Sequence, residues 1–135
     1  MLCRERAAQL RSREAEFAAA GAKLLFVGSG TPAMAADFAS THAGAHPVLS
    51  DVHRRCFEAA GMRRSIGAML HWRMWKNVWR ALRSGFRQAR VQGDPWQQGG
   101  VLVLDSDARL RHQQADRAGG DEIDVDAVLR VVTSA

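Results

Sequence analysis

The sequence predicts a single domain of the α/β class, and three features lead to this prediction. The short apolar run Leu24–Val27 lies between glycines, shows no alternation and is too short for a helix, so we interpret it as a strand buried on both faces. Helical patterns lie before and after it. A second short apolar strand follows at Pro47 to Leu49. Because parallel strands need a crossover connection, this order predicts a parallel β-α-β unit.

The length and the cysteine content narrow the class of protein. At 135 residues the chain fits one domain, residues 1–135, with its own apolar core. Cys3 and Cys56 are too few for a disulfide framework, and Met1–Arg6 is not followed by an apolar signal core. No apolar run approaches the roughly 20 residues of a membrane span. We therefore expect a soluble, cytoplasmic protein.

The charge of the chain is unevenly distributed. Arginine dominates, with 17 Arg against 2 Lys and a net charge of +5. Arg54–Arg90 holds ten basic residues and one acidic residue, Glu58, whereas Asp94–Asp126 holds eight acidic residues against three arginines. This polarity predicts either an anionic partner for the middle segment or an intramolecular match between the two halves.

The first half of the chain carries clear helix boundaries. Residues 3–20 have an apolar stripe and end at Gly21, which is placed as a C-terminal cap. Thr31 is a suitable N-cap and Pro32 a suitable first helical residue for a second helix that runs to about Ser40.

A third, short helix follows the Pro47 to Leu49 strand. Ser50 or Asp51 can cap its start, and Gly61 closes it after Ala60.

Residues 65–89 predict a basic amphipathic helix. The aromatic and apolar side contains Trp72, Trp75, Val78, Trp79, Leu82 and Phe86, and the basic side contains Arg73, Lys76, Arg80, Arg83 and Arg87. Basic side chains interleaved with aromatics can meet nucleic acid or an anionic membrane surface. We favour the plainer interpretation, in which the tryptophan stripe packs on a sheet and the arginines are solvated. We accordingly predict no nucleic-acid and no membrane partner.

The end of the chain predicts a hairpin and a helix. Val101–Leu104 is a second strand that is apolar on both faces, and Ala108 to Gln113 returns as the other arm after a turn. A final helix starts near Asp124, with apolar residues at i, i+3, i+4 and i+7, namely Val125, Val128, Leu129 and Val132.

The predicted order of elements is a thioredoxin-like layout without its usual first strand, and particular residues strengthen the likeness. They are Cys3-Arg4-Glu5 with Gln9-Leu10, Gly21-Ala22 with Phe26-Val27-Gly28, Pro47-Val48 with Asp51, Ala60-Gly61, and Arg83 through Val101 with its run Gly93-Asp94-Pro95-Trp96-Gln97-Gln98-Gly99-Gly100. This set resembles the peroxiredoxin-like branch of the AhpC/TSA superfamily over nearly the whole chain. The run that ends in Gly99-Gly100 is the most specific part of the resemblance.

The resemblance implies a thioredoxin-like sheet with helices on both faces and a redox-active cysteine at the start of the first helix, commonly in a Cys-x-x-Cys motif. Cys3 matches the second cysteine of that motif, so the first would fall one residue before Met1. We expect the domain to be N-terminally incomplete. Either the chain starts at an internal methionine of a longer reading frame, which we favour, or it is a shortened homologue that has lost its nucleophile.

The activity implied by the resemblance is thiol-based reduction of a peroxide or a disulfide. The expected partners are a small-molecule peroxide and a thiol or disulfide reductant, with no cofactor. No feature of the sequence predicts an oligomeric state.

Cys3 is the leading catalytic candidate on physical grounds as well. A thiol at a helix N-terminus faces unpaired N–H groups and the positive end of the helix dipole, which favours the thiolate. The alternative is a frayed, exposed thiol near the chain end without a fixed environment.

The second cysteine and the histidines give weaker indications of function. Cys56 is expected to pack into the core, with a resolving thiol as the alternative. The five histidines show no metal-ligand spacing, so we predict no metal site: His42, His46, His53, His71 and His112.

A dinucleotide fingerprint is the competing hypothesis. Gly28-x-Gly30-x-x-Ala33 follows a strand and precedes a helix, with Asp51 at the end of the next strand to hold a ribose. The later hairpin does not continue the β-α alternation of such a domain, so turn chemistry is the simpler interpretation of the glycines.

Overall fold

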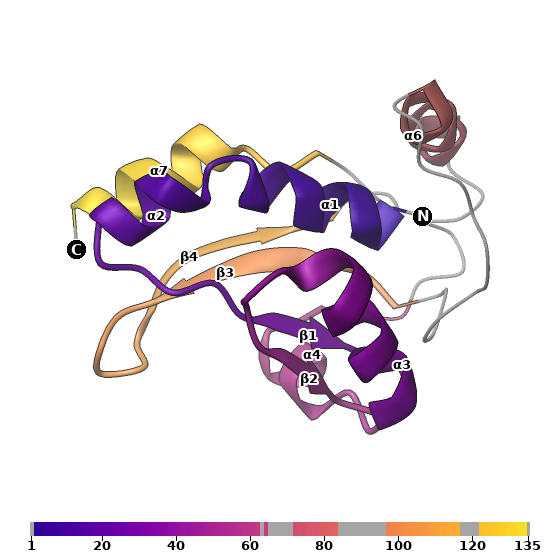
Figure 1. Ribbon diagram of the computed structural model, residues 1–135, viewed down its shortest axis with the longest axis horizontal. Helices are drawn as coiled ribbons and strands as arrows, with labels where there is room; N and C mark the ends of the chain where they lie inside the picture. Colours follow the sequence, from indigo (N-terminus) through magenta and orange to yellow (C-terminus); the bar gives the residue numbers. More distant parts are fainter. Residues whose placement is uncertain (1, 63, 65–71, 84–96, 117–121, 135) are drawn as a thin grey trace.

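Helices and short strands make up the computed structural model, which describes residues 2–62, 64, 72–83, 97–116 and 122–134 (Figure 1). The α/β class is confirmed. In chain order the elements are α1 (Leu2–Arg11), α2 (Glu14–Ala19), β1 (Phe26–Gly28), α3 (Pro32–Phe38), the π-helical turn η1 (Ala39–Ala43), β2 (Val48–Ser50), α4 (Arg55–Ala59), α6 (Trp72–Arg83), β3 (Gly100–Leu104), β4 (Leu110–Ala115) and α7 (Val125–Thr133).

The predicted β-α-β unit is confirmed. β1 and β2 pair in parallel, with Phe26 opposite Val48 and Gly28 opposite Ser50, and α3 and η1 form the crossover between them. α3 starts as predicted, because the Thr31 hydroxyl accepts a hydrogen bond from the Met34 N–H at 3.4 Å and Pro32 is the first helical residue. Both strands lie one or two residues later than the predicted runs.

The N-terminal helix is broken where one continuous helix was predicted. α1 ends at Arg11, and the Ser12 hydroxyl donates to the Gln9 carbonyl oxygen at 2.7 Å, which is a local bond that competes with helix continuation. α2 ends at Ala19, Gly21 follows the helix with φ of +73°, and the Ala22 N–H donates to the Phe17 carbonyl at 2.9 Å. The predicted glycine cap is therefore confirmed.

The second half contains the predicted hairpin and final helix. β3 and β4 pair antiparallel from Gly100 opposite Ala115 to Leu104 opposite Leu110. Asp124 caps α7, because its carboxylate accepts the Ala127 N–H at 2.9 Å. In Figure 1, α1, α2 and α7 lie above the hairpin, and α7 contacts both of its strands.

The prediction that both apolar strands are buried on both faces is wrong. In β3, Val103 is 8% exposed, whereas Leu102 is 37% and Leu104 is 56% exposed. Side chains alternate across a strand, and α7 covers one face of the hairpin, so alternate residues stay in contact with solvent. Leu25, in the predicted strand Leu24–Val27, is likewise exposed and lies just outside β1.

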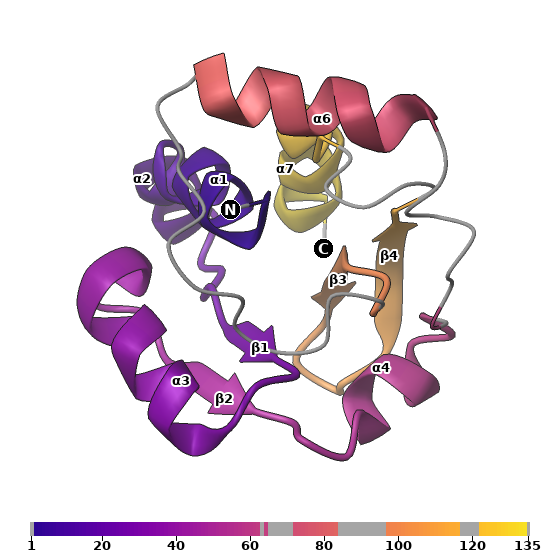
Figure 2. The ribbon, with the colours of Figure 1, turned by 90° about the vertical axis from the view of Figure 1, so that its right-hand side faces the viewer.

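Strand pairing in the described parts of the chain forms two separate two-stranded sheets. Figure 2 shows β1 and β2 on one side of the molecule and the β3–β4 hairpin on the other. A single thioredoxin-like sheet with β1 and β3 as its inner strands stays a prediction.

The apolar core lies between α1, α2, α7 and the hairpin. Its buried members come from both ends of the chain: Leu10, Phe17, Val103, Ile123, Val128 and Leu129. Burial of these side chains holds the N-terminal helices against α7, because the removal of apolar surface from water is the main favourable term in folding. Within the described ranges, no helix is long and apolar enough to cross a membrane.

Candidate functional site

Cys3 is an exposed free thiol in the first turn of α1. It is the second residue of a ten-residue helix, where backbone N–H groups lack intrahelical acceptors and the helix dipole is positive. The structure thus places Cys3 at the predicted point of the fold, at the start of the first helix.

Two ion pairs fix α1 immediately after Cys3. The Arg6 guanidinium, one turn further along, donates from Nη2 to Oδ1 of the buried Asp116 at 2.5 Å, beyond the end of β4. The buried Glu5 accepts from Nε and Nη2 of Arg80 in α6 at 3.0 and 3.3 Å. Cys3 therefore stands on a helix end that is tied to the hairpin on one side and to α6 on the other.

The Gln97–Gly100 segment packs beside the Arg6–Asp116 ion pair. The Asp116 N–H donates to the Gly99 carbonyl at 2.9 Å, and the Gln98 side-chain amide donates to the Asp116 carbonyl. A Cβ atom at Gly99 would collide with the Arg6 guanidinium. The glycine leaves the space through which Arg6 reaches its carboxylate, which is a physical reason for glycine at this position.

Contacts of Gly100 and Gln97 extend this packing. A Cβ atom at Gly100 would lie 2.5 Å from the Gln114 carbonyl oxygen and 2.6 Å from Met62 Cε. The Gln97 side-chain amide donates to the Met62 carbonyl at 3.0 Å. The residues that carry the sequence resemblance therefore join β3, β4 and the segment after α4, next to the helix that bears Cys3.

The packing prediction for Cys56 is wrong, because its side chain is exposed. Cys56 lies in α4, a five-residue helix at the surface, and its N–H donates to the Asp51 carboxylate at 2.7 Å. The Arg55 N–H donates to the same carboxylate at 3.0 Å. Asp51 thus caps α4 as predicted, although from further upstream than an ordinary N-cap.

These contacts change the acidity of Asp51. Partial desolvation acts to raise its pKa, but the hydrogen bonds from the Cys56 and Arg55 N–H groups outweigh it and hold the pKa below the ordinary value of 3.8. The carboxylate is therefore the form that stabilises the fold.

We expect Asp51→Ala to lower the stability at pH 7, because the N–H groups at the start of α4 lose their acceptor. A depressed carboxyl pKa contributes stability that is fully present above pH 3.8 and is lost as the pH falls through the folded-state pKa. The difference in free energy of unfolding between wild type and Asp51→Ala should shrink as the pH is lowered below that value, as measured by denaturant titration. Asp51→Asn is the control, since it keeps an acceptor oxygen without the charge. A difference that does not change with pH would contradict this assignment.

Two residues that the dinucleotide hypothesis would place at the ligand make hydrogen bonds within the protein. The Gly30 carbonyl accepts from the Ser50 hydroxyl at 2.6 Å, and both Asp51 oxygens accept backbone N–H groups of α4. No observation therefore favours Asp51 as a ribose ligand.

The predicted packing of the tryptophan stripe on a sheet is wrong for the two tryptophans whose side chains are described. Trp75 is 72% exposed and Trp79 is 66% exposed. α6 contacts α1, where Arg80 meets Glu5, and this contact leaves the tryptophan side in solvent. The rest of the predicted 65–89 helix, Trp96 and His71 lie outside the described residues.

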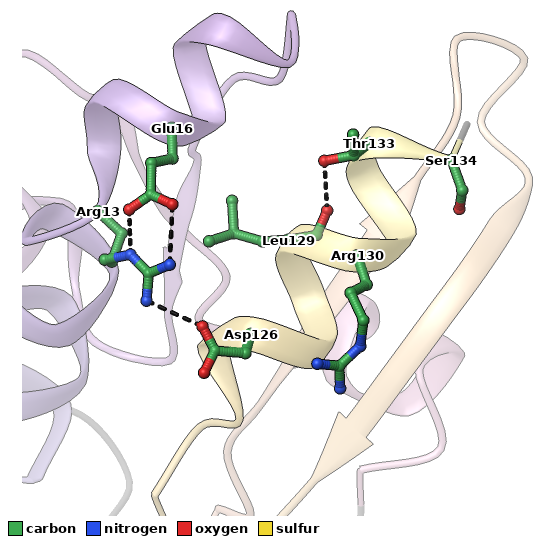
Figure 3. A pocket seen from close by; sticks show the side chains of 7 residues that line it. All are labelled: Arg13, Glu16, Asp126, Leu129, Arg130, Thr133 and Ser134. Atoms are coloured by element: carbon green, nitrogen blue, oxygen red, sulfur yellow. Dashed lines mark hydrogen bonds and ion pairs between the residues drawn. The ribbon is translucent and has the colours of Figure 1, made fainter.

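A shallow groove of about 530 Å³ lies between α2 and α7 (Figure 3). Arg13 on its wall pairs with Glu16 and Asp126, and hydrogen bonds to these two carboxylates raise the pKa of Arg13. No cysteine lines the groove, so it is separate from both thiols. In the described part of the chain, no group of three or more His, Cys, Asp or Glu side chains could hold a metal ion.

The sequence did not reveal the partners of Arg6 and Glu5. They lie 110 and 75 positions away, and nothing local marks such pairs in a single sequence. The run that ends in Gly99-Gly100 was a usable signal, because paired glycines indicate a close approach of another group.

Comparison with models of protein families gives a match. The model of a family described as AhpC/TSA antioxidant enzyme matches residues 9–117, a span that includes Cys56, Gly99 and Asp116 and begins after Cys3. Neither the curated proteins nor the solved structures give a match.

Proposed function

Since the chain belongs to the AhpC/TSA antioxidant enzyme family, we propose that it is a thiol peroxidase in which Cys3 is the attacking group. The observation that carries this proposal is the position of Cys3, an exposed thiol in the first turn of an anchored helix. Family membership supports thiol-based redox or antioxidant function at a coarse level. The proposal includes a single thioredoxin-like sheet as the fold of the domain.

The proposed reaction needs a peroxide and a small-molecule thiol. The Cys3 thiolate attacks one peroxide oxygen, an S–O bond forms, and the O–O bond breaks. The departing alkoxide or hydroxide takes up a proton to leave as an alcohol or water. The sulfenic acid on Cys3 then reacts with an external thiol to give a mixed disulfide and water, and a second thiol releases Cys3 and leaves as a disulfide. In sum, one peroxide is reduced and two thiols are oxidised.

The neighbouring ion pairs support this role by holding the reactive helix end in place. Arg6 and Glu5 tie α1 to Asp116 and Arg80, so the first turn has fixed anchors within one turn of Cys3. A fixed helix end keeps its N–H groups and its dipole directed at the thiol. Donors that are held in place stabilise the negative charge of a reacting group without first having to reorient.

A Cys-x-x-Cys arrangement would redistribute the roles. In a chain that carries a cysteine directly before Met1, that cysteine would attack, because the first thiol of such a pair is the more activated one. Cys3 would then act as the resolving thiol, and the reaction would end in an intramolecular disulfide in place of the mixed disulfide.

The test is peroxide consumption with a small-molecule thiol as reductant. Cys3→Ser should abolish consumption above the uncatalysed rate, because serine has no thiol to oxidise. Cys56→Ser should retain consumption, since Cys56 is the matched exposed thiol on a different helix. Equal rates for wild type and Cys3→Ser would refute the role of Cys3, and loss of activity with Cys56→Ser alone would assign the attack to Cys56.

A further inference from the structure

One face of α6 gathers two large aromatic side chains and two basic ones in contact with solvent. Trp75 and Trp79 are 72% and 66% exposed, and Lys76 and Arg83 are exposed beside them. At 3.6 residues per turn these four positions fall within an arc of roughly 100° of the helix surface. We refer to these four residues as the α6 face.

Arg80, which borders the α6 face beyond Lys76, ties α6 to the rest of the domain. Arg80 pairs with the buried Glu5 of α1 at 3.0 Å and with Glu122 at 3.6 Å. A rotation that buried the tryptophans would break the contact between Arg80 and a buried carboxylate, and a buried charge that loses its partner is costly. The α6 face therefore points outward as a consequence of how the helix is anchored, and Figures 1 and 2 show α6 at the outer edge of the molecule.

The charge around the α6 face selects the kind of partner. No acidic residue occurs anywhere between positions 59 and 93, a stretch that contains eight basic residues. A second copy of the chain would set this basic face against an identical basic face, which is repulsive. The complementary partner is anionic, and two exposed tryptophans require that it also accept apolar surface.

We propose that the α6 face docks on an anionic phospholipid surface. Tryptophan prefers the boundary between lipid and water, where its ring is partly in the apolar region and its N–H can reach polar groups. Lys76 and Arg83 lie at the level of the lipid phosphates in this arrangement, as basic residues of interfacial helices do. The surface contact revises the prediction of no membrane partner and goes beyond the proposed peroxidase function.

A nucleic acid fits the α6 face less well than a lipid surface. Proteins that stack bases combine their aromatic side chains with a basic groove that tracks the phosphate backbone. The groove described above lies on α2 and α7, and the two exposed tryptophans belong to a single helix that does not line it. A single exposed helix with interfacial aromatics suits a flat, soft surface.

The experiment measures binding of the full chain to vesicles by co-sedimentation and by tryptophan fluorescence. One set of vesicles is phosphatidylcholine, and the other is phosphatidylcholine mixed with phosphatidylserine. The wild type should bind the anionic vesicles more tightly and should be released by added salt. The double variant Lys76→Glu and Arg83→Glu should bind at least about 30-fold more weakly, because each basic residue near an anionic surface contributes roughly a factor of five.

Two further double variants test the contribution of the tryptophans and the effect of net charge outside α6. Trp75→Ala with Trp79→Ala should also lose binding while thermal unfolding stays close to wild type, since both side chains are exposed. Lys23→Glu with Arg130→Glu changes the net charge equally at exposed positions outside α6 and should bind like the wild type. Binding that both double α6 variants retain would overturn the proposal.

Other occupants give distinct results. If the wild type does not bind the anionic vesicles but binds a single-stranded RNA oligonucleotide through Trp75 and Trp79, the partner of the α6 face is a nucleic acid and not a lipid surface. Self-association that Trp75→Ala abolishes, without vesicle binding, would assign the α6 face to a second copy. Neither assay reads peroxide consumption, so failure of this proposal is distinguishable from failure of the peroxidase proposal.

Discussion

Replacing Asp116 with alanine is expected to lower the free energy of unfolding by about 3 kcal/mol, because removal of one member of a buried ion pair leaves the other charge poorly compensated. Asp116 is 5% exposed, and its carboxylate lies 2.5 Å from the Arg6 guanidinium. The pair joins α1 to the segment after β4, across 110 positions of sequence. Denaturant unfolding measures the loss.

The matched control is Asp126→Ala. Asp126 also pairs with an arginine, Arg13, but the Asp126 side chain is 67% exposed. Surface ion pairs contribute little to stability, because solvent and salt screen them. Asp126→Ala should therefore unfold close to wild type, and equal losses for the two variants would contradict the special role of the Arg6–Asp116 pair.

Gly100→Ala is expected to destabilise the protein by about 2 kcal/mol through overpacking. The added Cβ atom would lie 2.5 Å from the Gln114 carbonyl oxygen, which belongs to the backbone of β4 and cannot move without disturbing the hairpin. The Met62 side chain closes the same space at 2.6 Å. Thermal or denaturant unfolding measures this effect.

Gly28→Ala is the control for the loss of glycine as such. Gly28 also lies in a strand, but a Cβ atom there would be 4.0 Å from the Leu49 carbonyl oxygen, which is ordinary contact. Its effect should be small, because the added methyl group meets no neighbour closely. A loss for Gly28→Ala as large as that for Gly100→Ala would show that the clash at Gly100 is not the cause.

Much of the fold follows from local sequence signals. Thr31, Pro32, Gly21 and Asp124 set helix ends by rules that involve only a few neighbouring residues, and each is confirmed. The parallel pairing of β1 and β2 follows from the order of elements. Such features are predictable because their causes lie within one turn or one connection.

Burial was harder to predict, because it depends on which partner covers each face. Leu102 and Leu104 belong to an apolar run without alternation, yet α7 covers one face of the hairpin and leaves these side chains exposed. Trp75 and Trp79 have the spacing of a docked helix face, but the ion pair between Arg80 and Glu5 orients α6 the other way. Neither outcome is visible from the spacing of apolar residues.

The position of the candidate site was predictable from the sequence, but the residues that anchor its helix were not. The start of the first helix identified Cys3, whereas Asp116 and Arg80 come from segments far along the chain. The uneven charge offered a partial signal. Arg80 of the basic segment pairs with Glu122 of the acidic segment at 3.6 Å, so the intramolecular match is confirmed at this contact.

The most direct measurement for the central claim is mass-spectrometric mapping of sulfenic acid after brief exposure of the wild-type chain to peroxide, with a trapping reagent such as dimedone. The account predicts that the adduct accumulates on Cys3 well before it appears on Cys56, because Cys3 lies at the start of a ten-residue helix while the N–H of Cys56 donates to the Asp51 carboxylate. Equal labelling of the two exposed cysteines, or labelling of Cys56 first, would contradict Cys3 as the reactive thiol.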